Sequence, residues 1–259
     1  CMRITLLGTG TSVGIPMIGC TCETCRSTDP RDTRLRTACH VESGNLSIVI
    51  DTGPDFRQQM LRADVQHIDA VLWTHHHFDH IMGVDDLRPY FFDCKAPIPC
   101  FAHPESANVL QSIFPYIWGK RKAYPGTLRL YPADTSFRIK SRYDKPDTIN
   151  VTPIEMLHGQ MPINGYRIGN FAYLTDVSHI PETEYWKLED LDLLVLNALR
   201  PTKHPRHFSI SEAKNVAERI RAKQTVFVHM SHQVLHARES TLLTEGMALG
   251  YDGMVLETT

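Results

Sequence analysis

Four histidines and an aspartate crowd into seven residues directly after a short apolar run. The seven are residues 74–80 (THHHFDH), and the run is residues 70–73 (AVLW), which predicts a buried strand. Imidazoles gathered at the end of a buried strand repel one another when charged and lose hydration when neutral, unless a cation uses their lone pairs. The stretch therefore predicts a metal site. A His-rich surface loop or a terminal tag is the alternative, but a tag would lack the interposed Asp79.

The spacing within this stretch suggests how the ligands divide. Alternate side chains of an extended segment lie on one side, so His75, His77 and Asp79 can converge on one place. His80 follows directly and can serve a second ion. Because these side chains cannot complete two metal shells, further ligands must lie downstream.

Candidates for those ligands follow other strand-like runs. His158 follows one such run, Asp176 ends another, and His229 and His232 follow a third. Taken singly, each has an ordinary interpretation, as a loop residue, a helix cap or a hydrogen-bonded core histidine. Together with residues 74–80 they form a set that one edge of a sheet could gather.

The residues resemble the metallo-beta-lactamase superfamily, whose His-x-His-x-Asp-His motif appears here in residues 75–80. The likeness runs nearly end to end and points to the branch with the tRNA 3'-processing endonucleases and the phosphoribosyl cyclic phosphodiesterases. It is carried further by residues 4–12 (ITLLGTGTS), 50–53 (IDTG), 175–176 (TD), 207–209 (HFS) and 251–253 (YDG) and by the single His158. The resemblance implies an α/β protein with a four-layer αββα sandwich.

The resemblance also implies ligand sets for two metal ions. His75, His77 and His158 would hold one ion, Asp79, His80 and His232 the other, and Asp176 would bridge them. His232 is preferred to His229 because the family's Thr-His-x-Ser-His pattern uses its last imidazole, although Val228 replaces the Thr here.

Three cysteines lie within six residues, in the segment Gly-Cys-x-Cys-x-x-Cys that favours the phosphodiesterase group. Cys20, Cys22 and Cys25 suit tetrahedral zinc better than they suit the His/Asp site, and His236 is the expected fourth ligand, with another His or a water as alternatives. The alternative to a metal site is three unrelated buried thiols. A structural zinc here would fix a loop beside the active site.

Paired divalent cations suggest hydrolysis. Zinc, manganese or iron could supply a bridging hydroxide at neutral pH, with Asp79 and Asp176 taking part in catalysis. By the resemblance, His207 acts as general acid on the leaving group; a solvent-facing histidine in the basic residues 200–207 is the alternative. The expected function is phosphodiesterase action on a small cyclic or linear phosphodiester. The alternatives are an RNA-processing endonuclease and a thioesterase or lactone hydrolase using the same site.

Composition agrees with one domain over residues 1–259, with an ordered insertion around residues 114–148 where prolines and glycines interrupt any periodic run. Net charge is -2, so nucleic acid is not strongly attracted, and no counterpart of the long tRNA-gripping arm is evident. Basic residues of the insertion, among them residues 120–122 and Arg142, are expected on a solvated surface. No membrane partner is expected, the location is expected to be cytoplasmic, and a homodimer is allowed by the resemblance.

Periodicity predicts alternating strands and helices. Strands are expected at residues 3–7, 46–51, 70–74, 99–102, 149–154, 166–175, 193–196, 225–229 and 254–257, and helices at residues 54–62, 104–114, 209–221 and 238–248. The helix at 209–221 has the clearest signal, a Ser cap followed by an apolar stripe.

Overall fold

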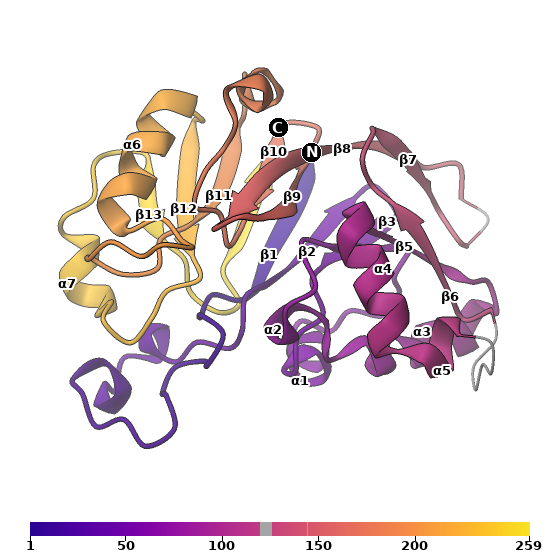
Figure 1. Cartoon of the computed structure of the whole chain (residues 1–259), viewed down its shortest axis with the longest axis horizontal. Coiled ribbons are helices and arrows are strands. Elements are labelled where there is room, and N and C mark those ends of the chain that lie inside the picture. Colours follow the sequence, from indigo (N-terminus) through magenta and orange to yellow (C-terminus); the bar gives the residue numbers. More distant parts are fainter. Residues whose placement is uncertain (120–125, 144) are drawn as a thin grey trace.

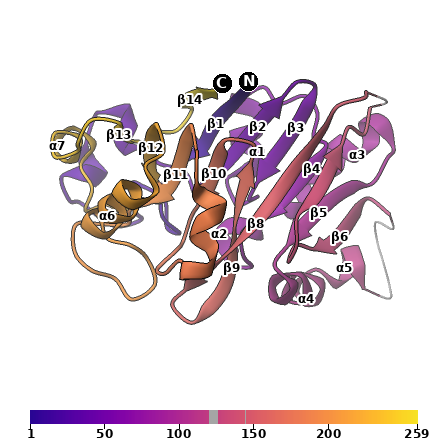
Figure 2. The same ribbon diagram turned by 90° about the horizontal axis from the view of Figure 1, so that it is seen from above.

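The structure is a computed structural model, and it describes residues 1–119, 126–143 and 145–259. Within these residues, two seven-stranded sheets face each other (Figures 1 and 2). The first sheet has the order β14 (Val255–Thr258), β1 (Met2–Gly8), β2 (Ala38–Ser43), β3 (Leu46–Ile50), β4 (Ala70–Trp73), β5 (Ile98–Ala102), β6 (Leu128–Pro132). The second has the order β13 (Met247–Leu249), β12 (Gln224–Val228), β11 (Leu193–Asn197), β10 (Phe171–Leu174), β9 (Met161–Ile168), β8 (Thr148–His158), β7 (Phe137–Lys140).

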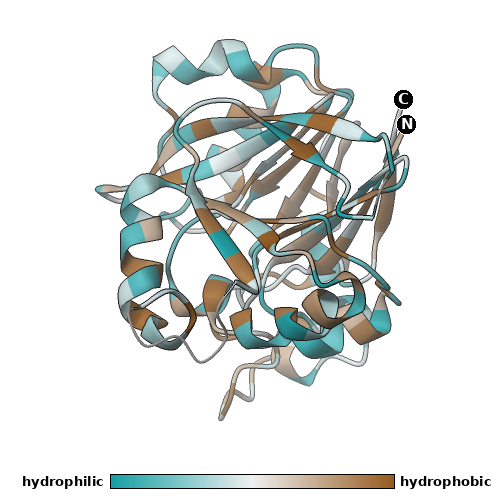
Figure 3. Ribbon diagram, turned by 90° about the vertical axis from the view of Figure 1, so that its right-hand side faces the viewer, coloured by the Kyte–Doolittle hydropathy of each residue, from teal (hydrophilic) through white to brown (hydrophobic). Residues whose placement is uncertain are grey.

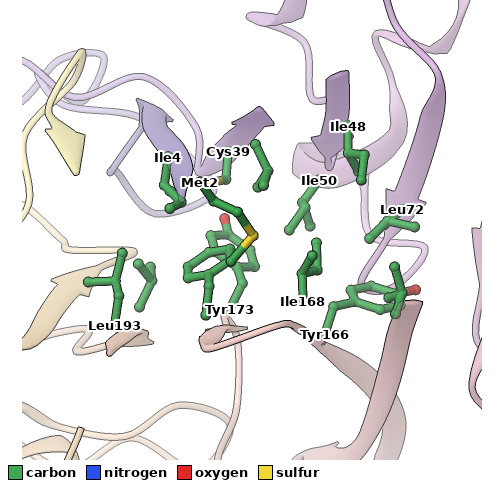
Figure 4. Close-up of a cluster of buried hydrophobic side chains, with 14 of the residues drawn as sticks. Met2, Ile4, Cys39, Ile48, Ile50, Leu72, Tyr166, Ile168, Tyr173 and Leu193 are labelled. Carbon is green, nitrogen blue, oxygen red and sulfur yellow. The ribbon is translucent and has the colours of Figure 1, made fainter. Parts of the chain in front are cut away.

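Strand alternation divides the apolar side chains of each sheet between a shared inner core and an outer core of its own. In β3, Ile48 and Ile50 point between the sheets, whereas Val49 points to the outer face, and β4 repeats this with Leu72 and Trp73. The core between the sheets is completed from the second sheet by residues such as Tyr166, Ile168, Tyr173 and Leu193 (Figure 4). Strands buried on both faces read as continuous apolar runs, which is why β3 and β4 were predictable from the sequence.

Helices cover the outer faces and complete four layers. The first sheet is covered by α1 (Phe56–Arg62), α3 (Arg88–Cys94), α4 (Pro104–Ile113) and α5 (Pro115–Trp118), and the second by α6 (Ile210–Ile220) and α7 (His236–Ser240). Apolar residues concentrate on the strands inside, and the helices alternate between polar and apolar (Figure 3). The αββα arrangement expected from the resemblance is confirmed.

The predicted helix α6 and its Ser209 cap are both confirmed. The Ser209 hydroxyl accepts a hydrogen bond from the Glu212 backbone N–H, and the Glu212 carboxylate accepts one from the Ser209 backbone N–H, which is a capping box. The two buried residues Ala213 and Ala217 lie on the side that packs into the outer core of the second sheet.

Two predictions of secondary structure were wrong. Residues 166–175 contain the end of β9 and the whole of β10, which pair antiparallel, because the chain turns at Gly169, which has φ +55°. The helix expected over residues 238–248 is confined to the short α7, and Met247–Leu249 instead forms β13, which pairs in parallel with β12. In both cases the prediction continued one strand or helix through residues at which the chain turns.

Residues 114–148, expected as an insertion, supply an edge strand to each sheet. β6 pairs with β5 and β7 pairs with β8. Arg142, expected at the surface, donates instead to the backbone carbonyls of Ile68, Tyr90 and Ala96. The basic residues 120–122 lie outside the described residues.

In the described ranges, the structure contains no helix with the length and apolar character needed to cross a bilayer.

Candidate metal centre

Six of the seven expected ligands, together with His229, meet where strands of both sheets end. His75 and His77 follow β4, Asp79 and His80 lie in the four-residue helix α2 (Phe78–Ile81), and His158 is the last residue of β8. From the second sheet, Asp176 follows β10 and His229 follows β12. Because β10, β11 and β12 run parallel, their carboxyl ends lie at one edge, the end of the sandwich where α2 appears in Figure 1.

The ligand atoms form overlapping groups, in each of which all atoms lie within 4.8 Å of one another. The first group is His75, His77 and His158, and the second is Asp79, His80, Asp176 and His229. A third group, His158, Asp176 and His207, overlaps the other two. Asp176 therefore lies between the first two groups, since it also forms a group with His158 of the first.

Hydrogen bonds fix the tautomers of three imidazoles. Asp51 Oδ2 accepts from His80 Nδ1 at 2.7 Å, and the Asp176 carbonyl accepts from His158 Nδ1 at 2.7 Å. Thr74 donates its hydroxyl hydrogen to Asp51, so its oxygen accepts from His75 Nδ1 at 3.1 Å. When each ring is neutral, its Nε2 lone pair is left free, as in metal-binding histidines. Burial would lower the pKa of His80, but without an ion the carboxylates of Asp79 and Asp176 outweigh it and raise that pKa well above its usual value.

Polar atoms in this pocket lack partners that an ion would supply. Nε2 of His75, His80 and His229 is buried without a hydrogen-bond partner among the described residues. Buried polar atoms are nearly always satisfied, so three such nitrogens around two carboxylates fit bound divalent cations.

The electrostatics of the pocket also fit cations. Burial alone would raise the pKa of the Asp176 carboxyl, but the imidazoles of His229 and His80 outweigh it and hold that pKa well below its usual range. Asp79 behaves in the same way, with His80 the main partner that lowers its pKa. Burial, with the neighbouring His80, lowers the pKa of His75 well below its usual value. The pocket thus favours ionised carboxylates and, at His75, a neutral imidazole.

His232 does not lie where the resemblance placed it, and His229 takes that position. His229 Nε2 is 3.1 Å from Asp176 Oδ1 and 3.6 Å from Asp79 Oδ2. The reason is local: His229 directly follows β12 with φ +59°, so its ring turns into the pocket, and the chain then leads His232 away toward the N-terminal loop.

The three cysteines come together as expected, and their fourth neighbour is His232. His232 Nδ1 lies 3.1 Å from Cys20 Sγ and 3.6 Å from Cys22 Sγ, and Cys20, Cys22, Cys25 and His232 form one group of potential ligands. The Cys25 backbone N–H lowers the pKa of Cys22 to about 7, whereas burial raises that of Cys25 to about 11. Three thiols and one imidazole fit tetrahedral zinc.

His236 was wrongly expected as that fourth neighbour. It begins α7 and belongs to none of the ligand groups found among the described residues. Its backbone N–H donates to Asp32 Oδ1 at 2.8 Å, and its ring lies 6.4 Å from that of Tyr251.

His207 faces the pocket from the segment just before α6. Its Nδ1 lies 3.7 Å from Asp176 Oδ1, and its ring stacks on that of His229 at 4.8 Å between centroids. Burial lowers the pKa of His207 to about 2, against the opposing effect of Asp176, so the ring is neutral before any anion binds. The alternative of a solvent-facing histidine is wrong, since His207 is buried.

A cavity of about 240 Å³ lies over these groups. Its wall includes Thr11, Ser12, His204 and Arg206, and five candidate ligands: His77, Asp79, His158, Asp176 and His229. A more open cavity of about 600 Å³ shares Arg206 with it and continues past the turn after β8.

Sequence reasoning assigned no role to Asp51, which is fully buried and accepts from both His80 and Thr74. The segment that contains it was used only as part of the resemblance. A carboxylate directly after an all-apolar strand was the available signal, because a buried carboxylate needs partners.

Comparisons with known proteins agree with this fold. A family model described as beta-lactamase superfamily domain matches residues 47–230. A diphosphatase from the PhnP family has 38% identity and a TM-score of 0.89, over 98% of this chain and 96% of that one. The short form of human tRNase Z (18% identity, TM-score 0.68, 98% of each chain) shows the fold alone.

Another relative is named for acyl transfer and not for hydrolysis at phosphorus. An octanoyltransferase of Porphyromonas gingivalis is 37% identical over 260 residues, which cover 98% of this chain and 51% of the relative. The chain thus spans about half the length of that protein. With the family model matching most of the chain and the sandwich fold established, the chain belongs to the beta-lactamase superfamily, as a member with the metallo-beta-lactamase fold.

Proposed function

We propose that the chain is a dinuclear metal-dependent hydrolase that cleaves a small phosphodiester. The observation that carries this proposal is Asp176, whose two carboxylate oxygens face different imidazoles. Oδ1 lies 3.1 Å from His229 Nε2 and 4.0 Å from His75 Nε2, and Oδ2 lies 3.2 Å from His80 Nε2. One carboxylate can therefore serve both ligand groups.

Ions held by these groups would supply a Lewis acid and lower the pKa of a water molecule toward neutrality. His75, His77 and His158 would hold one, and Asp79, His80 and His229 the other, with Asp176 shared. Asp51 orients His80, and the Asp176 carbonyl orients His158. Zinc, manganese and iron all accept these ligands.

His207 is proposed as the proton donor. A water loses a proton to solvent and its oxygen bonds to phosphorus, while the bond from phosphorus to the leaving oxygen breaks and that oxygen takes a proton from the His207 ring. An anionic phosphate beside the ring favours its protonated form, so substrate binding opposes the effect of burial on its pKa. Solvent returns the proton after the product leaves.

The pocket supports a small anionic substrate. Arg206 and His204 lie in its wall, and among the described residues no ion-pair partner is found for the Arg206 guanidinium. The similar diphosphatase also breaks a bond at phosphorus, which supports this reaction class. An RNA substrate is the less favoured choice, since the likeness to tRNase Z rests on the fold.

Acyl ester or thioester hydrolysis is the second candidate, favoured by the octanoyltransferase relative. A metal-polarised carbonyl can be attacked as readily as phosphorus.

The experiment compares four substrates with one metal-loaded enzyme: bis-p-nitrophenyl phosphate, a 2',3'-cyclic nucleotide, an octanoyl thioester of N-acetylcysteamine and a precursor tRNA. Asp176→Asn is the negative control. The proposal predicts that the two small diesters are hydrolysed and that Asp176→Asn loses this activity. Preferred hydrolysis of the thioester, or of precursor tRNA, would replace it by the corresponding alternative.

We further propose a cytoplasmic location, which the seven free cysteines support because thiols stay reduced there. The homodimer allowed by the resemblance stays a prediction, to be checked by light scattering of the purified protein.

A further inference from the structure

The segment between the two metal groups is short and strained. His229 belongs to the group with Asp79, His80 and Asp176, and His232 belongs to the cysteine group. Only two residues separate them. His229 adopts φ +59°, a left-handed conformation that non-glycine residues rarely take, so contacts from other parts of the chain must hold it.

Backbone hydrogen bonds hold the segment on one side. The Met230 N–H donates to the Thr9 carbonyl at 3.0 Å, and the Thr11 N–H donates to the Met230 carbonyl at 3.1 Å. The Ser231 N–H donates to the Leu199 carbonyl at 2.8 Å. Met230 is therefore tied to the first strand's loop and Ser231 to the end of the second sheet.

A buried arginine holds the segment on the other side. The Arg34 side chain is 0% exposed, and its guanidinium donates to the carbonyls of Ser231 at 3.2 Å and Val234 at 2.8 Å. Asp32 Oδ1 balances its charge at 2.9 Å and also accepts from the His236 N–H at 2.8 Å. One ion pair thus fixes three points of residues 231–236.

The same ion pair is joined to the cysteine loop. Asp32 Oδ2 accepts from the Ser27 hydroxyl at 2.7 Å, and Ser27 follows the short 3-10 helix Thr24–Arg26 that contains Cys25. We call the Asp32–Arg34 pair with its contacts to Ser27, Ser231 and Val234 the brace. The brace and the His232 contacts connect the cysteine group to His229 by two separate routes (Figure 1, indigo loop below α7).

We propose that the cysteine group and the brace position His229, so that metal binding at the cysteine site and at the Asp79, His80, Asp176 and His229 site is coupled. This rests on the metal-binding part of the proposed function. Arg34 acts as a positioning residue, because its guanidinium donates to the Ser231 and Val234 carbonyls of the segment that carries His229. Coupling between two binding sites is reciprocal, so each ion strengthens the binding of the other.

The test reads the two sites separately with Co²⁺, since thiolate ligands add near-ultraviolet charge-transfer bands that imidazole and carboxylate ligands lack. Metal-free protein is titrated with Co²⁺, with and without one prior equivalent of Zn²⁺, which thiolates take up first. We expect prefilling to tighten Co²⁺ binding at the His/Asp sites by about fivefold or more. If prefilling leaves the Co²⁺ affinity of the His/Asp sites unchanged in the wild-type protein, the proposal is wrong.

Variants separate the two routes. Cys22→Ser removes a cysteine ligand and Arg34→Gln removes the brace, and each should weaken Co²⁺ binding at the second His/Asp site by about fivefold or more. The matched controls are Cys94→Ser, a thiol of α3, and Arg31→Gln, an exposed arginine paired with Asp29. Controls should bind Co²⁺ as the wild type does.

Two results would count against the coupling: an empty cysteine site with unchanged affinity at the His/Asp sites, or equal losses in Arg34→Gln and Arg31→Gln. If Cys22→Ser does not fold, Arg34→Lys and the prefilling experiment decide. The readout is metal binding, so a failure to hydrolyse any phosphodiester would sink the proposed function and leave this result interpretable.

Discussion

Asp176 connects the two candidate ligand groups, and hydrogen bonds on either side hold its backbone in an unfavourable conformation. It has φ +60°, a conformation of order 1–3 kcal/mol unfavourable for a non-glycine residue. The Thr175 hydroxyl donates to its Oδ2 at 2.8 Å, its carbonyl accepts from His158, and the Val177 N–H beside it donates to Asn197 Oδ1 at 2.7 Å. Such over-determined strain is typical of functional sites.

The exchange of His229 and His232 can be tested by counting metals. His229→Ala should lose an ion from the His/Asp site and keep the thiolate charge-transfer bands of Co²⁺ at the cysteine site. His232→Ala should weaken those bands, because it removes the imidazole beside Cys20. Elemental analysis with Co²⁺ spectra checks both variants. Loss of the His/Asp ion in His232→Ala, with His229→Ala binding both ions, would restore the assignment made from the resemblance.

The role of His207 predicts a dependence on the leaving group. A general acid matters for an alkoxide, which needs a proton, and much less for p-nitrophenolate, which leaves as an anion. His207→Ala should therefore lose about 10²- to 10⁴-fold in kcat with an alkyl leaving group and far less with bis-p-nitrophenyl phosphate. Steady-state kinetics on metal-loaded protein measures both.

His204→Ala is the matched control, because its ring lies 5.1 Å from that of His207 in the same loop. It should show no such dependence on the leaving group. Equal losses for both leaving groups in His207→Ala would assign His207 to substrate binding instead.

At the scale of elements, β2 contains a buried histidine unrelated to the metal site. The Ser47 hydroxyl donates to the His67 carbonyl, so its oxygen accepts from His40 Nε2 at 2.8 Å. Burial lowers the pKa of His40 to about 4. The fold thus holds this imidazole neutral between two strands of the first sheet.

This shift predicts how stability depends on pH. The unfolded His40 takes up a proton near its ordinary pKa of 6.5 and the folded one only near 4, so its contribution is intact above pH 6.5 and is lost toward pH 4. The loss should reach about 3 kcal/mol. Urea unfolding of metal-free protein at pH 7 and pH 4.5 checks this against His40→Gln. An equal drop in both proteins would contradict the prediction.

Local patterns predicted the long central elements, and pairing with neighbouring strands decided the short and peripheral ones. β3, β4 and α6 carry continuous or periodic apolar signals and were predicted within one or two residues. β13 is three residues long and is stabilised by pairing with β12, a contact that no local window contains. β6 and β7 are edge strands whose identity depends on the sheet they join.

At the scale of the molecule, two sheets each supply part of one site, so the ions should stabilise the whole sandwich. β4 in the first sheet leads to His75, and β10 and β12 in the second lead to Asp176 and His229. A ligand that binds only the native state stabilises it by about 2.7 kcal/mol at a free concentration of 100 Kd.

Metal removal is therefore expected to lower the melting temperature. Each ion lost should shift Tm by about 5 °C or more, given roughly 2–4 °C per kcal/mol for a domain of this size. Differential scanning calorimetry of chelator-treated protein, before and after zinc is restored, measures the shift. Asp176→Asn should show a smaller one, and an unchanged Tm in the wild type would argue against ions shared between the sheets.

The sequence alone determined the chemical character of the site. His75, His77, Asp79 and His80 lie within six residues, and His158 and Asp176 each follow an apolar strand. Strand ends can be recognised locally, and the ends of neighbouring strands meet at one edge, so six of the seven ligands expected at the pair of ions could be placed before any coordinates. The cysteine cluster was equally local.

Tertiary structure alone decided which imidazole serves which group. His229 and His232 are chemically the same and three residues apart, so no local rule separates them. The left-handed turn at His229 aims one ring at Asp176, and the brace from Arg34 leads the other to Cys20. Those directions depend on contacts with residues about 200 positions away in the chain, because a backbone angle that is unfavourable by itself exists only where distant parts of the fold enforce it.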